Sequence, residues 1–225
     1  MVLLYMKDGV KMKIVRKTNE AEMILEFLKG ELNSKRFNEE LNNSLEKLKL
    51  DSSIIVNGDI TNEKENLNRL NIMKVFRGYP DEELFERFPK INEWKYLELN
   101  EEDIDNIYYI DYDYWNELSN GTSKPVEAAK IIKSGKEIYG VSNQPILDGV
   151  EYNKTNTFPP IILITCNNKK FLIIEGHSRM TVYGFNPRKL NGTYAFVGYT
   201  TESEMKKYDQ RMLTGEEVKT RNEYH

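Results

Sequence analysis

The sequence predicts an α+β protein, and three observations support this fold class. Apolar residues recur at helical spacing through most of the first part of the chain. From Trp94 onward, alternating and β-branched runs predict several strands. Among those runs, Pro125 begins a helical pattern, and a second helix follows a strand directly at Gly176. We therefore expect a mixed sheet with flanking helices over 93–213, an N-terminal helical region over 1–92, and a charged tail over 214–225.

Each element of the N-terminal region has a local signal. Asn19 with Glu22 forms a capping-box pattern that begins a helix. Apolar residues spaced three or four positions apart continue this helix and indicate a second one after it. The predicted elements are a short strand over Met12–Arg16, helices over Asn19–Leu32 and Phe37–Leu48, a brief β-branched run over Ser53–Val56, and helices over Glu63–Lys74 and Asp81–Phe88. Little in this region points to a particular chemistry, since Arg77 beside Gly78 is more typical of a solvated or ion-paired residue than of a phosphate ligand, and the role of the region is unknown.

The second half alternates strands and helices. Pro125 suits the first turn of a helix, and Ser134-Gly135 suits its end. The predicted elements are a strand over Trp94–Leu99, a helical turn at Glu101–Asp103, a helix from Pro125 to Lys133, a loop over Tyr139–Thr157, strands over Ile161–Thr165 and Phe171–Ile174, a helix after the second of these, and a strand over Tyr194–Tyr199. The charged tail is expected to be a frayed helix or a disordered end.

Composition excludes several kinds of site. The net charge of −4 does not build the positive field that non-specific duplex binding needs, so DNA is not a favoured partner. A single cysteine, Cys166, excludes an intramolecular disulfide and a multi-cysteine metal cluster. No apolar run near the start resembles a signal peptide or a membrane span. We therefore expect a soluble, cytoplasmic protein without a membrane partner.

The most informative residues are Glu175-Gly176-His177-Ser178-Arg179, where a buried strand runs directly into a helix. A helix start offers unpaired N–H groups and a positive dipole end, which bind anions and above all phosphate. Arg179 is expected to add a forked contact, and His177 and Ser178 to donate to phosphate oxygens. Glu175 lies where a general base or a ligand of magnesium-bound water is expected. In the structural alternative, these side chains only cap and solvate the helix.

This five-residue box and the order of elements around it resemble the ParB/sulfiredoxin superfamily. Members carry a strand, a short Gly-containing box that ends in Arg, and a helix, and the matching order covers roughly residues 94–212. The resemblance implies a ParB/sulfiredoxin-like mixed sheet that binds ATP, ADP or CTP with Mg²⁺. It implies that Gly176, His177, Ser178 and Arg179 hold the phosphates, while Glu175 or His177 orients the attacking hydroxyl or water.

Within the superfamily, the box is most similar to the Asp-Gly-His-His-Arg box of the free serine kinases. Sulfiredoxin-like members have a catalytic cysteine where this chain has His177, and Cys166 lies outside the box, so sulfinic acid reduction is not expected. Chromosome-partition members continue into a helix-turn-helix domain, for which the roughly forty residues after Phe185 are too few. The predicted activity is that of a phosphotransferase, with a small-molecule acceptor, or of a nucleotide hydrolase.

A second cluster lies in the aromatic run Tyr108–Trp115. If this run is extended, Asp111 and Asp113 point the same way and could hold magnesium through water. The alternative is that one of them caps a helix while the aromatic residues form core or a stacking platform. Two further functions stay open: a non-enzymatic DNA- or protein-binding regulator with a ParB-like fold, and a ParB-like nuclease that uses these two acids.

Overall fold

The computed structural model describes residues 12–34, 36–80 and 85–213. The chain divides into two compact units: Thr18–Pro89 forms one, and the described residues on either side of it, 12–17 and 90–213, form the other. Strand β1 (Lys13–Thr18) is an edge strand of the sheet in the second unit, so nearly all of it belongs to that unit. The α+β class expected from the sequence is confirmed. In the described part of the chain, no helix has the length and apolarity that crossing a membrane requires.

The first unit is helical, whereas the strand that was predicted within the same N-terminal region, β1, belongs to the sheet of the second unit. Its helices are α1 (Glu20–Leu32), α2 (Asn38–Leu48), α3 (Ser53–Val56) and α4 (Glu63–Arg77). The side chains of Asn19 and Asn62 cap α1 and α4 by accepting from backbone N–H groups three residues later. Gly78 ends α4 in the left-handed conformation. The expected helix over Asp81–Phe88 lies partly outside the described residues, and the charged tail over 214–225 lies wholly outside them.

One prediction in this unit is wrong: Ser53–Val56 is a helical turn and not a β-branched run in an extended conformation. The carboxylate of Asp51 accepts from the backbone N–H of Ser53 at 2.8 Å, which supports a helical start there. Ile55 is fully buried. Burial of this one apolar side chain and the local hydrogen bond outweigh the weak strand preference of the branched residues.

A buried arginine fixes the end of the helical unit that contains α3. Arg69 of α4 has no exposed surface. Its Nη1 donates to the Ile54 carbonyl at 2.7 Å, its Nη2 donates to the Asp59 carbonyl at 2.9 Å, and Glu65 pairs with it at 3.1 Å. Arg69 therefore ties α4 to α3 and to the turn that follows it.

The second unit is built on a mixed six-stranded sheet in the order β1-β2-β6-β4-β5-β3. Its other strands are β2 (Glu93–Leu99), β3 (Ile107–Tyr108), β4 (Ile161–Thr165), β5 (Phe171–Glu175) and β6 (Thr193–Tyr199). The pairs β2–β6 and β4–β5 are antiparallel, whereas β4–β6 and β3–β5 are parallel. All five residues of β4 are buried, as expected for a central strand covered on both faces.

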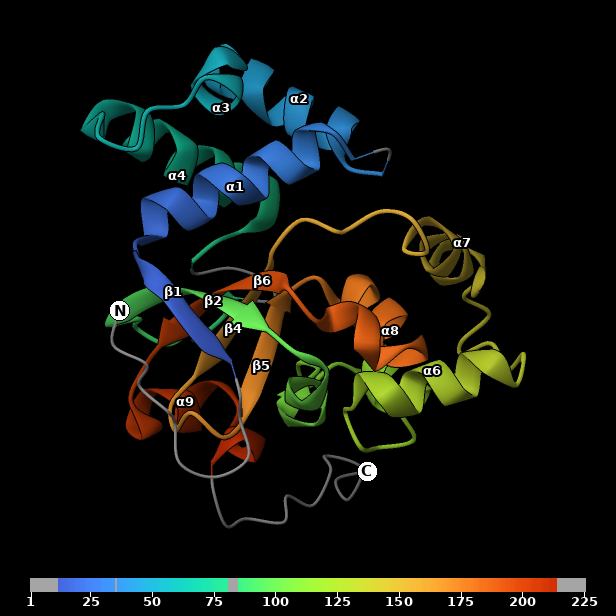
Figure 1. Cartoon of the computed structure of the whole chain (residues 1–225). Helices are drawn as coiled ribbons and strands as arrows, with labels where there is room; N and C mark the ends of the chain where they lie inside the picture. The colour runs from blue at the N-terminus through green and yellow to red at the C-terminus, as the bar shows by residue number, and fades with distance from the viewer. Residues whose placement is uncertain (1–11, 35, 81–84, 214–225) are drawn as a thin grey trace, which may run out of the picture. The chain divides into compact units, whose positions relative to one another are not determined.

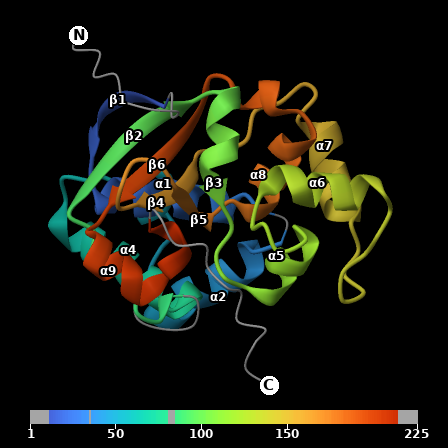
Figure 2. The same ribbon diagram turned by 90° about the horizontal axis from the view of Figure 1, so that it is seen from below.

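Helices α6 (Pro125–Lys133), α7 (Gln144–Tyr152) and α8 (His177–Phe185) group together beside this sheet (Figures 1 and 2). Gly184 of α8 lies directly against the Pro125 carbonyl, so α8 and α6 approach closely. The main core cluster includes Leu97, Ala128, Leu163, Ile173, Met180 and Val197. The remaining helical segments are α5 (Asp113–Leu118), α9 (Glu202–Tyr208), and the 3₁₀ turns η2 (Glu101–Asn106), η3 (Pro187–Leu190) and η4 (Gln210–Met212).

Two stretches of this unit differ from the sequence prediction. The expected loop over Tyr139–Thr157 contains α7, of which only Ile146 is buried, so its apolar signal is weak. The aromatic run Tyr108–Trp115 is not extended, because β3 ends at Tyr108 and α5 begins at Asp113. The other predicted strands and the Pro125 helix are confirmed within one or two residues at their ends.

Candidate functional site

The predicted strand-to-helix junction is present, and its geometry requires glycine. Strand β5 ends at Glu175, Gly176 has φ of 102°, and α8 begins at His177. A Cβ atom at Gly176 would lie 2.6 Å from Cγ2 of Ile161 in the neighbouring strand β4. Both the left-handed backbone and the close approach of β4 therefore exclude a larger residue.

The start of α8 has no side-chain cap. Side chains cap α1, α4 and α9, through Asn19, Asn62 and Thr201, whereas α2, α3, α5, α6 and α7 also lack a side-chain cap. The first bond of the α8 ladder runs from the N–H of Met180 to the Gly176 carbonyl at 2.8 Å, and no acceptor within the described residues meets the three preceding N–H groups. Ser178 is exposed in this first turn. The helix thus presents uncapped donors and the positive end of its dipole beside a solvent-accessible hydroxyl.

Arg179 lies in the same turn, but much of its guanidinium group is already engaged. Its Nη1 donates to the carbonyls of Pro159 and Pro160 at 2.8 and 2.9 Å, and its Nη2 donates to Glu175 at 3.3 Å. These bonds hold the Pro-Pro segment against the start of α8. A guanidinium has five N–H groups, so the Nε–H and one Nη2–H have no acceptor among the described residues.

His177 is packed into an aromatic stack. Its ring lies nearly parallel to those of Trp115 and Tyr109, with centroid separations of 5.3 and 6.0 Å. The Nε2 atom is buried and has no hydrogen-bond partner in the described structure. Burial lowers the pKa of His177 from 6.5 to about 4, against the opposing effect of Glu175. The imidazole is therefore neutral near pH 7 and does not contribute a positive charge to an anion site.

The backbone of the same turn is tied to this stack. The Thr181 hydroxyl donates to the His177 carbonyl at 2.8 Å and bonds the buried Tyr109 hydroxyl at 2.7 Å. The sequence pattern predicted core or a stacking platform around Tyr109 but did not connect it with the box. Tyr109, Trp115 and Thr181 are thus supporting residues that the sequence alone did not identify.

Glu175 supplies the one carboxylate of the box. Its side chain is 31% exposed and lies at the end of β5, one residue before the helix start. The ion pair with Arg179 at 3.3 Å neutralises part of its charge. Glu175 can therefore lie beside a bound anion with less repulsion than an isolated carboxylate would cause.

Asp111 and Asp113 do not form the arrangement expected of them. Asp113 is the first residue of α5, so the two carboxylates are not alternate residues of a strand. Asp111 accepts from the Asn116 amide at 2.7 Å and lies 3.9 Å from Arg211, and both interactions compete with a cation. Among the described residues, no group of three or more His, Cys, Asp or Glu side chains could hold a metal ion. The continuous strand from which a magnesium site at Asp111 and Asp113 was predicted is therefore absent, and the site itself stays a prediction.

The fold and the site together define an α+β protein in which strand β5 of the mixed sheet leads through Gly176 into the uncapped helix α8. In comparison with known proteins, no family model, curated protein or solved structure matches the chain significantly.

Proposed function

We propose that this protein binds the phosphate groups of a nucleotide at the start of α8, and that its reaction class is phosphoryl transfer or nucleotide hydrolysis. The observation that carries the proposal is the uncapped first turn of α8, which follows a left-handed glycine directly from a central strand. Backbone N–H groups in this setting are a common means of holding phosphate. The resemblance of the box to the ParB/sulfiredoxin superfamily points to the same ligand.

Each box residue has a definite part in this proposal. The N–H groups of His177, Ser178 and Arg179 donate to the terminal phosphate, and the Ser178 hydroxyl adds a further donor. Gly176 allows the backbone to turn. The Nε–H and the free Nη2–H of Arg179 supply positive charge at the edge of the site. Its Nη1 group keeps the Pro159-Pro160 segment in place. Donors fixed before the ligand arrives stabilise developing negative charge without reorganisation.

Glu175 is the better candidate for orienting the attacking hydroxyl or water. Its carboxylate is partly exposed beside the helix start. The Nε2 of His177 is buried within the aromatic stack, so His177 acts through its backbone N–H and through the packing of its ring. ATP, ADP and CTP are the nucleotides that we propose to test, each with Mg²⁺. No protein ligand for the ion is assigned, because the strand that would align Asp111 with Asp113 is absent.

The experiment is a thermal-shift measurement with ATP, ADP, CTP and GTP in the presence of magnesium. The test variant is Ser178→Asp, which places a carboxylate at the second residue of α8. The positive end of the helix dipole stabilises this carboxylate, whereas its negative charge repels a bound phosphate. The matched control is Ser203→Asp, at the second residue of α9, whose first turn Thr201 already caps. Both serines are exposed, and both variants change the charge by the same amount.

We expect at least one nucleotide to stabilise the wild type and the Ser203→Asp variant. At a ligand concentration about 100 times the dissociation constant, the gain is about 2.7 kcal/mol, or roughly 5–10 °C in Tm for a chain of this size. The Ser178→Asp variant should fold normally and show no shift. An equal shift in all three proteins would place the nucleotide elsewhere. No shift with any nucleotide would favour the non-enzymatic regulator.

A further inference from the structure

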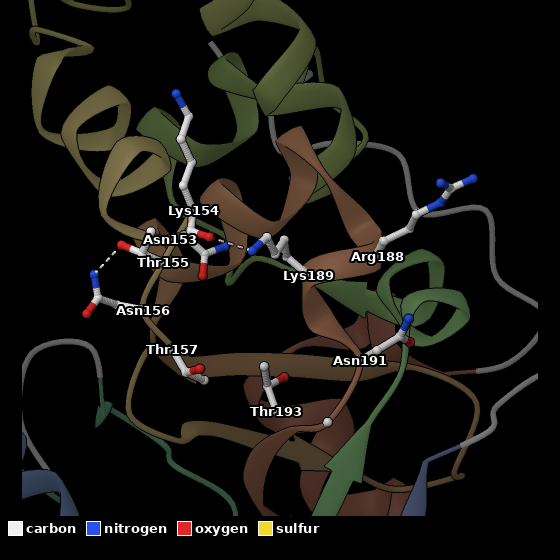
Figure 3. Close-up of a pocket in the computed structure, with 10 residues that line it drawn as sticks. Asn153, Lys154, Thr155, Asn156, Thr157, Arg188, Lys189, Asn191 and Thr193 are labelled. Atoms are coloured by element: carbon white, nitrogen blue, oxygen red, sulfur yellow. Dashed lines mark hydrogen bonds between the residues drawn. The ribbon is translucent and has the colours of Figure 1, made fainter.

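A second candidate site lies apart from the box, between the end of α7 and the segment that leads into β6. It is a cavity of about 250 Å³, formed by residues 153–157 and by residues 188, 189 and 191–193 (Figure 3). None of these residues belongs to the box, which lies at the other end of α8. The two places are separated by the length of α8, roughly 14 Å for its nine residues.

Two buried polar side chains reach this cavity. Asn153 is only 6% exposed as a residue, and its amide makes no hydrogen bond to another described residue, although solvent still reaches its polar atoms. Thr193 is 5% exposed, and its hydroxyl donates to the Leu190 carbonyl at 2.7 Å, so its oxygen can only accept from a ligand. Because this Asn153 amide lines the cavity and the protein uses neither its donor nor its acceptor, both can bond a polar ligand there.

The cations around the cavity are not equivalent. The ammonium group of Lys189 lies at the cavity, where it donates to the Lys154 carbonyl at 2.8 Å and keeps two further N–H groups (Figure 3). The side chain of Lys154 instead points away and pairs with Glu151 at 2.6 Å. Arg188 also extends outward and is 87% exposed. Lys189 is thus the cation placed to contact a bound group directly.

The lining also excludes several ligand classes. It contains hydroxyl, amide and cationic side chains but neither a carboxylate nor an aromatic ring. A cationic ligand would lack a counter-charge, and a nucleobase would lack a stacking surface. The volume lies just below the usual range for ligand sites, which suits a small molecule.

From these features we infer that the cavity binds a small phosphorylated sugar or polyol. The phosphate lies on Lys189, and the hydroxyl groups exchange hydrogen bonds with Asn153, Thr157 and Thr193. This inference is independent of the proposed nucleotide site, because it uses no residue of the box.

The test is calorimetric titration with ribose 5-phosphate, glycerol 3-phosphate, inorganic phosphate, ribose and AMP. We expect ribose 5-phosphate to bind more tightly than phosphate, ribose or AMP. Lys189→Ala should weaken its binding about tenfold, the usual effect of a lost charge-assisted hydrogen bond. The matched control, Lys154→Ala, removes the same charge from the same rim and should change affinity less than about twofold.

Two further variants distinguish binding in this cavity from binding at the box. Asn153→Asp keeps the shape of the side chain but places a carboxylate in the cavity, so it should abolish binding in a protein that circular dichroism shows to be folded. Ser178→Asp should leave the affinity for ribose 5-phosphate unchanged, whatever it does to nucleotides. Failure of all phosphorylated sugars to bind, equal losses in the two lysine variants, tighter binding of AMP, or loss of binding in Ser178→Asp would each overturn the inference.

Discussion

Replacement of Gly176 by alanine tests whether the junction has the geometry described. The backbone φ of 102° is strained for any residue with a Cβ atom, at a cost of about 1–3 kcal/mol. The new methyl group would also lie 2.6 Å from Ile161 Cγ2 and force β4 or α8 to shift, which costs about 1–3 kcal/mol more. The expected loss is about 2–6 kcal/mol of unfolding free energy, the sum of the two contributions.

The matched control is Gly135→Ala, at a glycine with φ of 80° and no atom within 4 Å of the added methyl group. This variant carries the backbone strain without the clash, so it should lose only about 1–2 kcal/mol. Urea unfolding followed by tryptophan fluorescence is the appropriate assay, because Trp94 and Trp115, the two tryptophans of the chain, both belong to the sheet-containing unit. Equal losses in the two variants would refute the close packing of β4 against the junction.

Two other predictions concern the buried charge of the helical unit and the buried imidazole. Arg69→Met should destabilise the helical unit by about 3–5 kcal/mol because buried carbonyls and Glu65 lose their partner. The control Lys64→Met, on the exposed face of α4, should change stability by less than about 0.5 kcal/mol. Thermal unfolding followed by circular dichroism measures both variants. The pKa of His177 is lowered from 6.5 to about 4 in the folded protein. Between pH 6.5 and about 4, the imidazole is therefore protonated in the unfolded chain but neutral in the folded one. Stability should therefore fall on acidification through this window, and urea titrations should show a flatter dependence for His177→Phe; equal slopes would contradict a neutral buried imidazole.

Local signals were sufficient to predict most of the second unit. Alternation and β-branching identify β2, β4, β5 and β6, and Pro125 marks the start of α6 without reference to the rest of the chain. Helix α7 escaped prediction because its position depends on tertiary contact. Gly149 allows α7 to approach Val182 of α8 closely, and no local pattern contains that information.

The candidate site was predictable in place but not in detail. The five box residues are adjacent in sequence, so the strand, the glycine and the helix start could be read together. The partners of Arg179 at Pro159 and Pro160 and the stacking of His177 on Trp115 connect residues far apart in the chain. The extended run on which the two-carboxylate prediction was based is absent, because β3 ends at Tyr108 and α5 begins at Asp113.

The proposed binding of phosphate groups by the uncapped N–H groups at the start of α8 can be observed at those groups themselves. The measurement records the backbone amide resonances of the ¹⁵N-labelled protein during titration with ATP and CTP in the presence of magnesium. The amide signals of Gly176, His177, Ser178 and Arg179 should shift first and most strongly, and those at the capped start of α9 should not respond. Saturable shifts confined to other residues, or none at all, would contradict it.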